Sequence, residues 1–314
     1  MPPSKVVLAS PRGYCAGVDR AVDTVERALD HFGPPVYVRR EIVHNRHVVS
    51  ELTDRGAVFV ETEEDVPPGA VLVLSAHGVA PEVHRRSSER SLQVLDATCP
   101  LVTKVHSEAR RFADRGYTIV LVGHAGHEEV IGTMGEAPEA IRLVESIADV
   151  ETLDVPDPER VAYITQTTLS VDETVEIIAA LRRRYPAAIG PKRDDICYAT
   201  QNRQNAVKRL ATVVDLVLVI GSQNSSNSNR LVEVTRELGV PAHLIDDETD
   251  IDPGWLDGVE TVGITSGASA PETLVDRVIA HFRAMGVASV ESQAAEPEDV
   301  HFSLPVELRR AVGS

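Results

Sequence analysis

The sequence predicts an α/β protein built from three similar units, in which helices cover mainly parallel sheets. Three observations support this fold class. Aliphatic residues are plentiful while aromatic residues make up 4% of the chain, strand-like apolar runs alternate with segments of helical spacing, and the same order of elements recurs three times. Buried aliphatic strands that alternate with helices are typical of parallel sheets.

Each repeat is expected to begin with a helix headed by a cysteine. Apolar residues follow Cys15 at helical spacing as far as Gly33, and they follow Cys99 in the same way after Pro100, which a first helical turn tolerates. The third helix is expected after Cys197, in YATQNRQNAVKRLATVV. The three cysteines of the chain therefore occupy equivalent places.

A strand and a polar loop are expected next in each repeat. The strands are predicted in residues 35–43, 118–123 and 215–221. The loops lie at nearly the same distance from their cysteines: His44 is 29 residues after Cys15, His127 is 28 after Cys99, and Ser225 is 28 after Cys197. Because this spacing is nearly equal in all three repeats, chance is a poor explanation of the positions of the cysteines.

A later apolar strand ends in a small polar cluster in each repeat. These segments are residues 70–82, 160–173 and 261–272. Ser170 and Glu173 have the spacing of a capping box, as have Ser269 and Glu272, so a helix is expected to follow each serine.

The repeats are expected to span residues 15–98, 99–196 and 197–285. Residues 1–14 would supply an N-terminal strand and residues 286–314 a tail, and both would pack on the repeats. Within the tail, an acidic, loop-like stretch over residues 286–300 would lead to a last strand in HFSLP (301–305) and a short helix after Pro305.

Composition excludes some classes of partner. The net charge of −17 argues against general affinity for nucleic acid or anionic membranes, which need a basic face. No apolar run approaches the length of a membrane span, and the first residues lack the apolar core of a signal peptide. A cytoplasmic protein that can still bind a small anion in a local pocket is expected.

The three cysteines are expected to converge. In parallel sheets, ligands gather at the carboxyl ends of strands and the N-termini of helices, where the helix dipole favours a thiolate. Three thiolates together would form a soft-metal site, either an iron–sulfur cluster or a Cys₃ zinc site, whereas inert buried thiols are the simpler alternative. The spacings of 84 and 98 residues match no zinc finger and no local ferredoxin motif, so the pattern alone does not name the metal.

Seven segments together resemble one family. They are RGYCAGV, LDATCP, GHAGHEEVIGTMG, TQTTLSVDET, DDICYATQNRQ, GSQNSSNSNRL and TSGASAPE. The sequence resembles the iron–sulfur 4-hydroxy-3-methylbut-2-enyl diphosphate reductases, the LytB/IspH family, from about residue 5 to residue 312. The resemblance implies three α/β domains in a pseudo-threefold cloverleaf around one central [4Fe–4S] cluster per chain, with Cys15, Cys99 and Cys197 as its ligands.

The resemblance also implies an activity. The family removes the hydroxyl of 4-hydroxy-3-methylbut-2-enyl diphosphate reductively and forms isopentenyl and dimethylallyl diphosphate, the last step of the non-mevalonate isoprenoid pathway. The hydroxyl would bind the cluster iron that has no cysteine, and a ferredoxin- or flavodoxin-type protein would supply two electrons one at a time. A [4Fe–4S] hydro-lyase and a cluster-based sensor are the alternatives.

The resemblance assigns roles near the reacting hydroxyl. Glu129 matches the family's proton donor and Thr167 the residue that hydrogen-bonds the substrate hydroxyl, while His127 lines the pocket. Without the family, Glu129 would be a first-turn helix acid and Thr167 a strand-end threonine. The family commonly has His-Pro-Glu where this chain has His127, Glu128 and Glu129, so the turn before the acid is expected to be looser.

A second group matches the family's substrate-binding residues. The neutral donors and histidines expected to bind the diphosphate are His44, His77, Ser225, Ser226, Asn227 and Ser269. The alternative for the serine and asparagine run is a flexible polar loop, and for Ser269 it is a helix cap. The HxxH spacings of His44 with His47 and of His124 with His127 suggest zinc, but the family motif gives His47 and His124 no ligand role.

Overall fold

The computed structural model describes residues 3–294 and 298–313. Residues 1–2, 295–297 and 314 belong to the terminal segments expected to pack on the repeats and lie outside the described residues. In the part that is described, the chain forms two compact units. The first unit contains the chain up to Asp19, His44–Ser50 and Tyr198–His301, and the second contains Arg20–Val43, Glu51–Cys197 and the chain from Phe302 onward.

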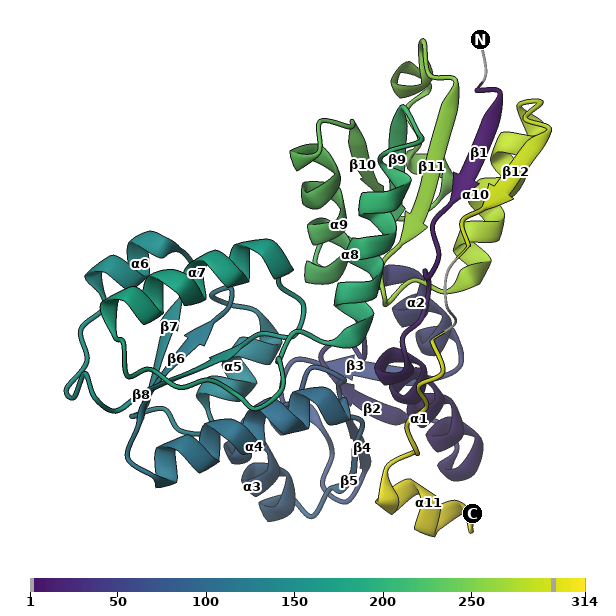
Figure 1. The fold of residues 1–314 in the computed structure, drawn as a ribbon. Helices are drawn as coiled ribbons and strands as arrows, with labels where there is room; N and C mark the ends of the chain where they lie inside the picture. Colours follow the sequence, from purple (N-terminus) through teal and green to yellow (C-terminus); the bar gives the residue numbers. More distant parts are fainter. Residues whose placement is uncertain (1–2, 295–297, 314) are drawn as a thin grey trace. The chain divides into compact units, whose positions relative to one another are not determined.

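The first unit is organised around one parallel sheet in its described residues, with the strand order β10-β9-β11-β1-β12. Its strands are β1 Lys5–Leu8, β9 Leu216–Ile220, β10 Ala242–Ile245, β11 Thr261–Ser266 and β12 Ser289–Ser292. Helices α8 Tyr198–Leu210 and α9 Ser226–Glu237 cover one face, and α10 Glu272–Ala284 covers the other (Figure 1). The predicted mainly parallel α/β class is therefore confirmed.

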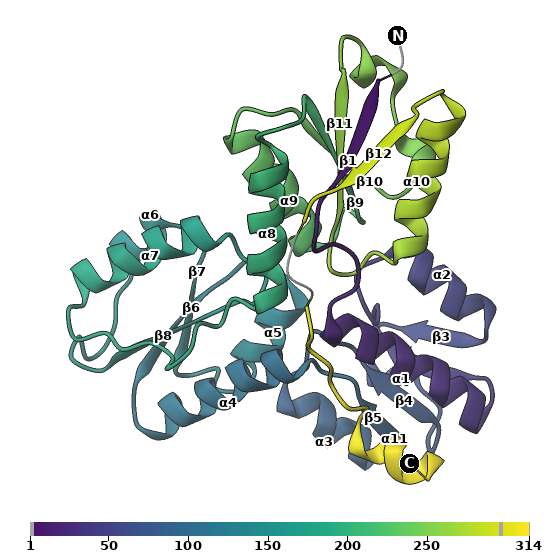
Figure 2. The same cartoon turned by 45° about the vertical axis from the view of Figure 1, so that its right-hand side comes forward.

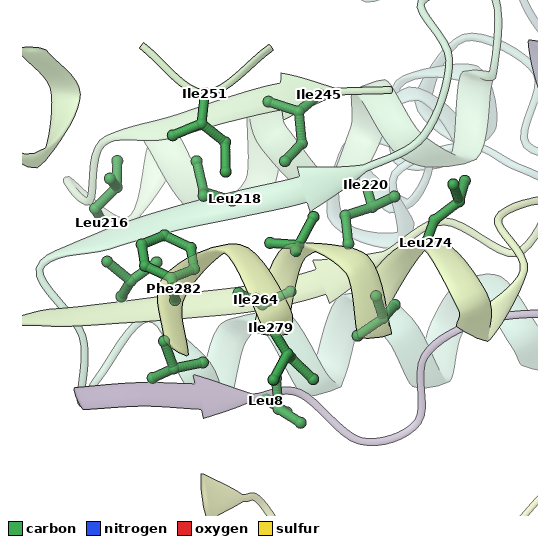
Figure 3. Packing of buried hydrophobic residues seen from close by; sticks show 14 of the residues in the cluster. Leu8, Leu216, Leu218, Ile220, Ile245, Ile251, Ile264, Leu274, Ile279 and Phe282 are labelled. Carbon is green, nitrogen blue, oxygen red and sulfur yellow. The ribbon is translucent and has the colours of Figure 1, made fainter. Parts of the chain in front are cut away.

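Side-chain alternation along the strands fixes these two faces. Leu8 and Ile264 point into the cluster that packs against Ile279 and Phe282 of α10 (Figure 3). Val7 belongs instead to the cluster beneath α8 and α9. Because successive strand residues face opposite sides, a strand buried on both sides reads as a continuous aliphatic run.

Two further parallel sheets lie in the described residues of the second unit. The order β3-β2-β4-β5 joins Ala57–Val60, Val36–Arg39, Val71–Leu74 and Gln93–Asp96, and the order β7-β6-β8 joins Ile141–Val144, Thr118–Val122 and Val161–Thr165. Figure 2 shows α6 and α7 on one face of the β6 sheet and α4 and α5 on the other, which matches two separate apolar clusters.

The remaining helices connect these strands. They are α1 Ala16–Phe32, α2 Arg46–Asp54, α3 Pro81–Glu89, α4 Pro100–Asp114, α5 Glu128–Met134, α6 Ile147–Thr152, α7 Val171–Arg184 and α11 Val306–Val312, with short 3₁₀ turns at Glu63–Asp65, Glu248–Asp250 and Pro253–Leu256. No helix in residues 3–294 or 298–313 is long and apolar enough to cross a membrane.

Several predicted elements are confirmed at their ends. The helices expected after Cys15, Cys99 and Cys197 are α1, α4 and α8, and Gly33 takes a left-handed φ of 73° directly after α1. Ser170 caps α7 and accepts a hydrogen bond from the Glu173 N–H, as the capping-box spacing predicts. The helix expected after Pro305 is α11.

Four expectations about local structure were wrong. The strand predicted over 35–43 ends at Arg39, because Arg40 has a φ of 55° and turns the chain. The last strand is β12, inside the stretch expected to be a loop, while residues 301–305 form no strand. Ser269 does not cap α10, because the helix begins after Pro271 and the serine side chain bonds elsewhere.

Candidate functional site

The three cysteines occupy the same local position in their sequence repeats. Each is half-buried and reduced and stands directly before α1, α4 or α8. Each also donates its backbone N–H to the carbonyl of the second residue beyond a strand. The pairs are Cys15 with Ala268 (3.3 Å) after β11, Cys99 with Ala76 (3.0 Å) after β4, and Cys197 with Thr167 (3.1 Å) after β8.

This placement fits a soft-metal cofactor by its chemistry. A half-buried thiol remains accessible, and its sulfur is a soft ligand of the kind that iron and zinc sites use. Thiolates are the ligands that iron–sulfur clusters use. Among the described residues, no three His, Cys, Asp or Glu side chains are gathered closely enough to hold a single metal ion.

The strongest local feature of the second unit is the pairing of Glu129 with Thr167. Glu129 lies in the first turn of α5 and is 2% exposed, and Thr167 follows the end of β8. One carboxylate oxygen accepts the Thr167 backbone N–H at 2.6 Å, and the other accepts its Oγ1–H at 2.9 Å. Both oxygens of a buried acid are thus fixed by one residue of a neighbouring loop.

Burial raises the pKa of Glu129 to about 7. The two hydrogen bonds from Thr167 lower this pKa but do not offset the loss of water, and the negative charge of Asp195 raises it further. The carboxyl group therefore changes its charge near neutral pH, which is the range in which a general acid is most effective. We call Glu129, Thr167, His127 and His77 the acid site.

His127 holds the turn that carries the acid. It caps α5, and its Nδ1 accepts the Glu129 N–H at 3.2 Å. This bond requires an unprotonated Nδ1, so the neutral ring carries its hydrogen on Nε2. The rings of His127 and His77 meet edge to face with their centroids 6.0 Å apart.

Glu128, at the position where the motif resemblance leads us to expect proline, contacts two basic side chains. Its carboxylate lies 3.5 Å from His77 Nδ1 and 3.7 Å from an Nη of Arg40. Glu128 and His77 are largely buried, with 17% and 15% of their side chains exposed. The substitution therefore adds an acidic group beside a predicted substrate-binding histidine.

The loop that carries His77 packs tightly between two helices. Gly78 has a φ of 79°, and a Cβ at this position would lie 3.0 Å from His106 and Val102 of α4. On α5, a Cβ on Gly132 would lie 3.2 Å from the Gly78 carbonyl. Because a side chain at either glycine would push the loop outward, both glycines help to position His77.

A second group of polar residues lies in the first unit. Ser225 caps α9 and accepts hydrogen bonds from the N–H and the Oγ–H of Ser228, at 3.3 and 2.9 Å. Its Oγ lies 3.5 Å from that of Ser269, which donates to the His44 carbonyl at 2.9 Å. Three predicted binding residues therefore meet at the N-terminus of a twelve-residue helix.

Asn227 connects this group to the loop of Cys15. Its Oδ1 accepts the Ala268 N–H at 2.8 Å, and its Nδ2 donates to Thr200 Oγ1 at 3.3 Å. The Ala268 carbonyl in turn accepts the N–H of Cys15. We call His44, Ser225, Asn227 and Ser269 the polar site.

The other predicted residues are placed less informatively. Ser226 is the first residue of α9 and is half-buried. His44 Nδ1 lies 3.3 Å from Asn224 Nδ2. His47 Nε2 lies 2.9 Å from an Asp247 oxygen, an ion-pair geometry that accounts for the side chain without zinc.

Sequence reasoning missed three contributors. Ser228 shares a hydroxyl bond with Ser225, and its spacing of three residues is a capping pattern that could have indicated it. Asp195 is 4% exposed and accepts the Thr165 N–H at 3.0 Å, although the pair of aspartates before Cys197 was a visible signal. Thr200 shows no such signal, because a threonine inside a helix is common.

Comparison with known proteins identifies the family of this chain. The family model described as "LytB protein" matches residues 6–283, which is most of the chain. The chain belongs to the LytB family. The predicted family is confirmed. Curated relatives of this chain are named reductases.

Two curated relatives illustrate the similarity within the LytB family. The 4-hydroxy-3-methylbut-2-enyl diphosphate reductase of Acidothermus cellulolyticus is 60% identical over 311 residues, covering 99% of this chain and 92% of the relative. The 4-hydroxy-3-methylbut-2-enyl diphosphate reductase 2 of Mycobacterium tuberculosis is 61% identical over 306 residues, covering 97% and 91%. The predicted enzyme class, an oxidoreductase, is confirmed.

Two solved structures share the LytB fold. The E-1-hydroxy-2-methyl-but-2-enyl-4-diphosphate reductase of Plasmodium falciparum has a TM-score of 0.96 at 37% identity, covering 99% of both chains. A structure of (E)-4-hydroxy-3-methyl-but-2-enyl diphosphate reductase, described as the terminal enzyme of the non-mevalonate pathway, has a TM-score of 0.64 at 33% identity and covers 90% of this chain and 99% of that chain.

Proposed function

We propose that this LytB protein reduces 4-hydroxy-3-methylbut-2-enyl diphosphate to isopentenyl and dimethylallyl diphosphate, a reaction that consumes two electrons and two protons and releases water. One proton leaves in the water, and the other is added to the allylic carbon chain. The names of its relatives support the substrate, and the buried pair of Glu129 and Thr167 is the observation that carries the chemistry. Breaking an allylic C–O bond with hydroxide as the leaving group is difficult. A proton delivered to the oxygen makes water the leaving group instead.

Glu129 would store that proton. With the pKa raised to about 7 by burial, the group is about half protonated at neutral pH and largely protonated below it. The 2.9 Å contact between Glu129 Oε2 and Thr167 Oγ1 can then reverse, because a hydroxyl both donates and accepts. Glu129 would donate to Thr167 Oγ1, and Thr167 would direct its own hydrogen to the substrate hydroxyl.

His127 and His77 would complete the acid site. His127 fixes the start of α5 and therefore the position of the Glu129 side chain, through its bond to the Glu129 N–H. His77 lies beside His127 and is proposed to bind an oxygen of the substrate. The largely buried setting of Glu128, Glu129 and Thr167 would limit the access of water to the reacting carbon.

The polar site is proposed to bind the diphosphate. Ser225, Asn227 and Ser269 are buried polar side chains at the N-terminus of α9, where N–H groups and the helix dipole favour an anion. His44 and Ser226 would add donors from the same unit. Neutral donors suit this task in a chain with a net charge of −17, since they bind oxygen atoms without a cluster of lysines.

Cys15, Cys99 and Cys197 are proposed to hold one [4Fe–4S] cluster, with the three α/β repeats arranged as a cloverleaf around it. The equivalent position of each thiol before a helix supports this assignment. When bound, the cluster would supply electrons one at a time and an iron with an open position for the substrate hydroxyl. A ferredoxin- or flavodoxin-type carrier in the cytoplasm is proposed as the electron donor.

The test is anaerobic turnover of 4-hydroxy-3-methylbut-2-enyl diphosphate with a one-electron reductant, with iron and sulfide counted in the same sample. Formation of the two five-carbon diphosphates only when reductant is present supports the proposal. Release of water without reductant would favour a [4Fe–4S] hydro-lyase. A preparation with full iron and sulfide that stays inert with reductant would overturn the assigned substrate.

A further inference from the structure

Each cysteine-headed helix carries a basic side chain that points to a backbone segment distant in sequence. Arg20 and Lys104 lie five residues after Cys15 and Cys99, and Arg203 lies six residues after Cys197. In all three cases the side chain donates to main-chain carbonyls. Those carbonyls belong to the segment that leads into a different cysteine.

Arg20, on the helix of Cys15, holds the segment before Cys99. Its two Nη atoms donate to the carbonyls of Thr98 at 3.0 Å and Asp96 at 3.2 Å. Burial lowers the pKa of Arg20, while the negative charge of Asp96 beside it acts in the opposite direction. Thr98 is bonded directly to Cys99 in the chain.

Lys104, on the helix of Cys99, holds the segment before Cys197. Its Nζ donates to the carbonyls of Arg193 at 2.6 Å and Asp194 at 3.1 Å. It also donates to the Asp195 carboxylate at 2.9 Å. Three consecutive residues leading toward Cys197 are therefore bound to one ammonium group.

Arg203, on the helix of Cys197, holds the segment before Cys15. The side chain is fully buried, and it donates to the Gly13 carbonyl at 2.6 and 3.2 Å and to the Tyr14 carbonyl at 3.3 Å. Its other Nη bonds the Ala199 carbonyl at 3.1 Å and the Glu298 carboxylate at 3.1 Å.

We infer that Arg20, Lys104 and Arg203 form a cyclic set of clasps, in which the helix of each cysteine holds the chain entering the next. The order runs from Cys15 to Cys99, from Cys99 to Cys197, and from Cys197 back to Cys15. Each cysteine is thus supported twice, by the N-terminus of its own helix and by a cation from the preceding one. The cations are positioning residues, because each one fixes the backbone that leads into the next cysteine.

A second contact closes the same link of the cycle. The Ala16 N–H, directly after Cys15, donates to the Tyr198 hydroxyl, directly after Cys197, at 3.3 Å. The Cys15 loop is therefore held by two side chains of α8, and Arg203 is expected to be the strongest clasp.

The test is a set of three substitutions in the full-length protein, Arg20→Met, Lys104→Met and Arg203→Met. Alkylation rates of the three thiols are measured individually by mass spectrometry in the metal-free chain. Arg20→Met should raise the alkylation rate of Cys99 about 10-fold over the wild type, because the backbone before that cysteine is no longer held. Lys104→Met should do the same for Cys197, and Arg203→Met for Cys15. The alkylation rate of the cysteine at the head of the substituted helix should stay within about twofold. A rise at the cysteine of the same helix, or an equal rise at all three, would overturn the inference.

Matched controls come from the helices α1 and α4. Arg27→Met removes an exposed arginine of α1 that pairs with Asp23 at 2.7 Å, and Arg110→Met removes an exposed arginine of α4 that pairs with Glu136 at 2.6 Å. Neither substitution should change the alkylation rate of any of the three thiols. If Arg203→Met does not fold, Arg203→Lys and Glu298→Gln test the same clasp with smaller changes, and either should raise the rate of Cys15 alone.

A second readout rests on the proposed function. In anaerobically reconstituted protein, iron release to a chelator should be faster in each clasp variant than in the wild type, by about 10-fold for Arg203→Met. If the wild type binds no cluster, this readout fails together with the proposed cofactor. The alkylation pattern in the metal-free chain still decides whether the clasps exist.

Discussion

The acid site and the polar site both bury polar side chains at loops, but only the acid site buries a carboxyl group. In the acid site, a titratable carboxyl group, Glu129, is buried and bonded by both oxygens to Thr167. In the polar site, Ser225, Asn227 and Ser269 are also buried but neutral, and their hydrogen bonds go to hydroxyl groups and main-chain atoms.

The difference concerns charge. Burial of an ionisable group moves its pKa, which is useful where a proton must be transferred. Burial of neutral hydroxyl and amide groups costs little once they are hydrogen-bonded, and it fixes donors for a ligand without adding a group that titrates. Substitutions should therefore affect turnover in the acid site and affinity in the polar site.

The largest effect is expected for Glu129→Gln. The amide keeps the shape of the side chain but cannot deliver a proton, so kcat should fall by about 100-fold to 10,000-fold. Steady-state turnover with a one-electron reductant measures the change, with iron and sulfide counted in each sample. Glu63→Gln is the matched control, because Glu63 is also buried but pairs with Arg39 at 3.0 Å. Unchanged turnover in Glu129→Gln would remove the proton-donor role.

The pH dependence of turnover is expected to follow Glu129. A proton donor must be protonated, and its pKa is raised to about 7, so kcat should fall as the pH rises through about 7. The decrease should approach tenfold per pH unit above that value. A kcat that stays level from about pH 6 to about pH 8.5, with the cluster intact, is the result that contradicts it.

The free energy of unfolding should also depend on the titration of Glu129 and should decrease as the pH rises. The folded-state pKa of Glu129 lies above the ordinary value of 4.5, so its contribution is fully present below pH 4.5 and is lost as the pH rises toward about 7. The free energy of unfolding of the wild type, relative to Glu129→Gln, should therefore decrease across this window by at most about 3 kcal/mol. Denaturant unfolding of both proteins at several pH values measures the difference.

The two sites also differ in how far the sequence reveals them. Helix positions follow from apolar spacing and from stop signals such as Gly33, and the residues of both sites follow from motif resemblance. The contacts of Ser269 could not be predicted in this way. Ser269 and Glu272 have the spacing of a capping box, but in the structure Pro271 is the N-cap of α10 and the Ser269 hydroxyl bonds the His44 carbonyl instead. A local pattern can state which bonds are possible, but tertiary packing selects among them. The end of the strand at Arg39 depends likewise on the left-handed residue that follows it.

A smaller effect is expected in the polar site, for Ser269→Ala. The change removes the bond to the His44 carbonyl and the contact with Ser225, which together position the donors. A net loss of about 1.5 kcal/mol corresponds to a rise in KM of roughly 10-fold, while kcat should stay within about twofold. Ser146→Ala is a suitable control, because the Ser146 hydroxyl also donates a hydrogen bond, to Asp149 at 2.9 Å, but lies at the start of α6. A loss of kcat with unchanged KM would show that the polar site takes part in the chemical step.

The smallest effect is expected at Glu128, which lies beside the acid site and contacts His77. Its carboxylate lies 3.5 Å from His77 and 3.7 Å from Arg40, and such partly exposed pairs contribute less than about 1 kcal/mol. Glu128→Gln removes the charge and keeps the shape, whereas Glu128→Pro restores the family's usual residue and its fixed φ. Because the negative charge of Glu128 would oppose an anionic substrate, both variants should lower KM by about twofold to threefold with kcat unchanged. If only Glu128→Pro changes the kinetics, the backbone of the turn rather than the charge is the relevant difference.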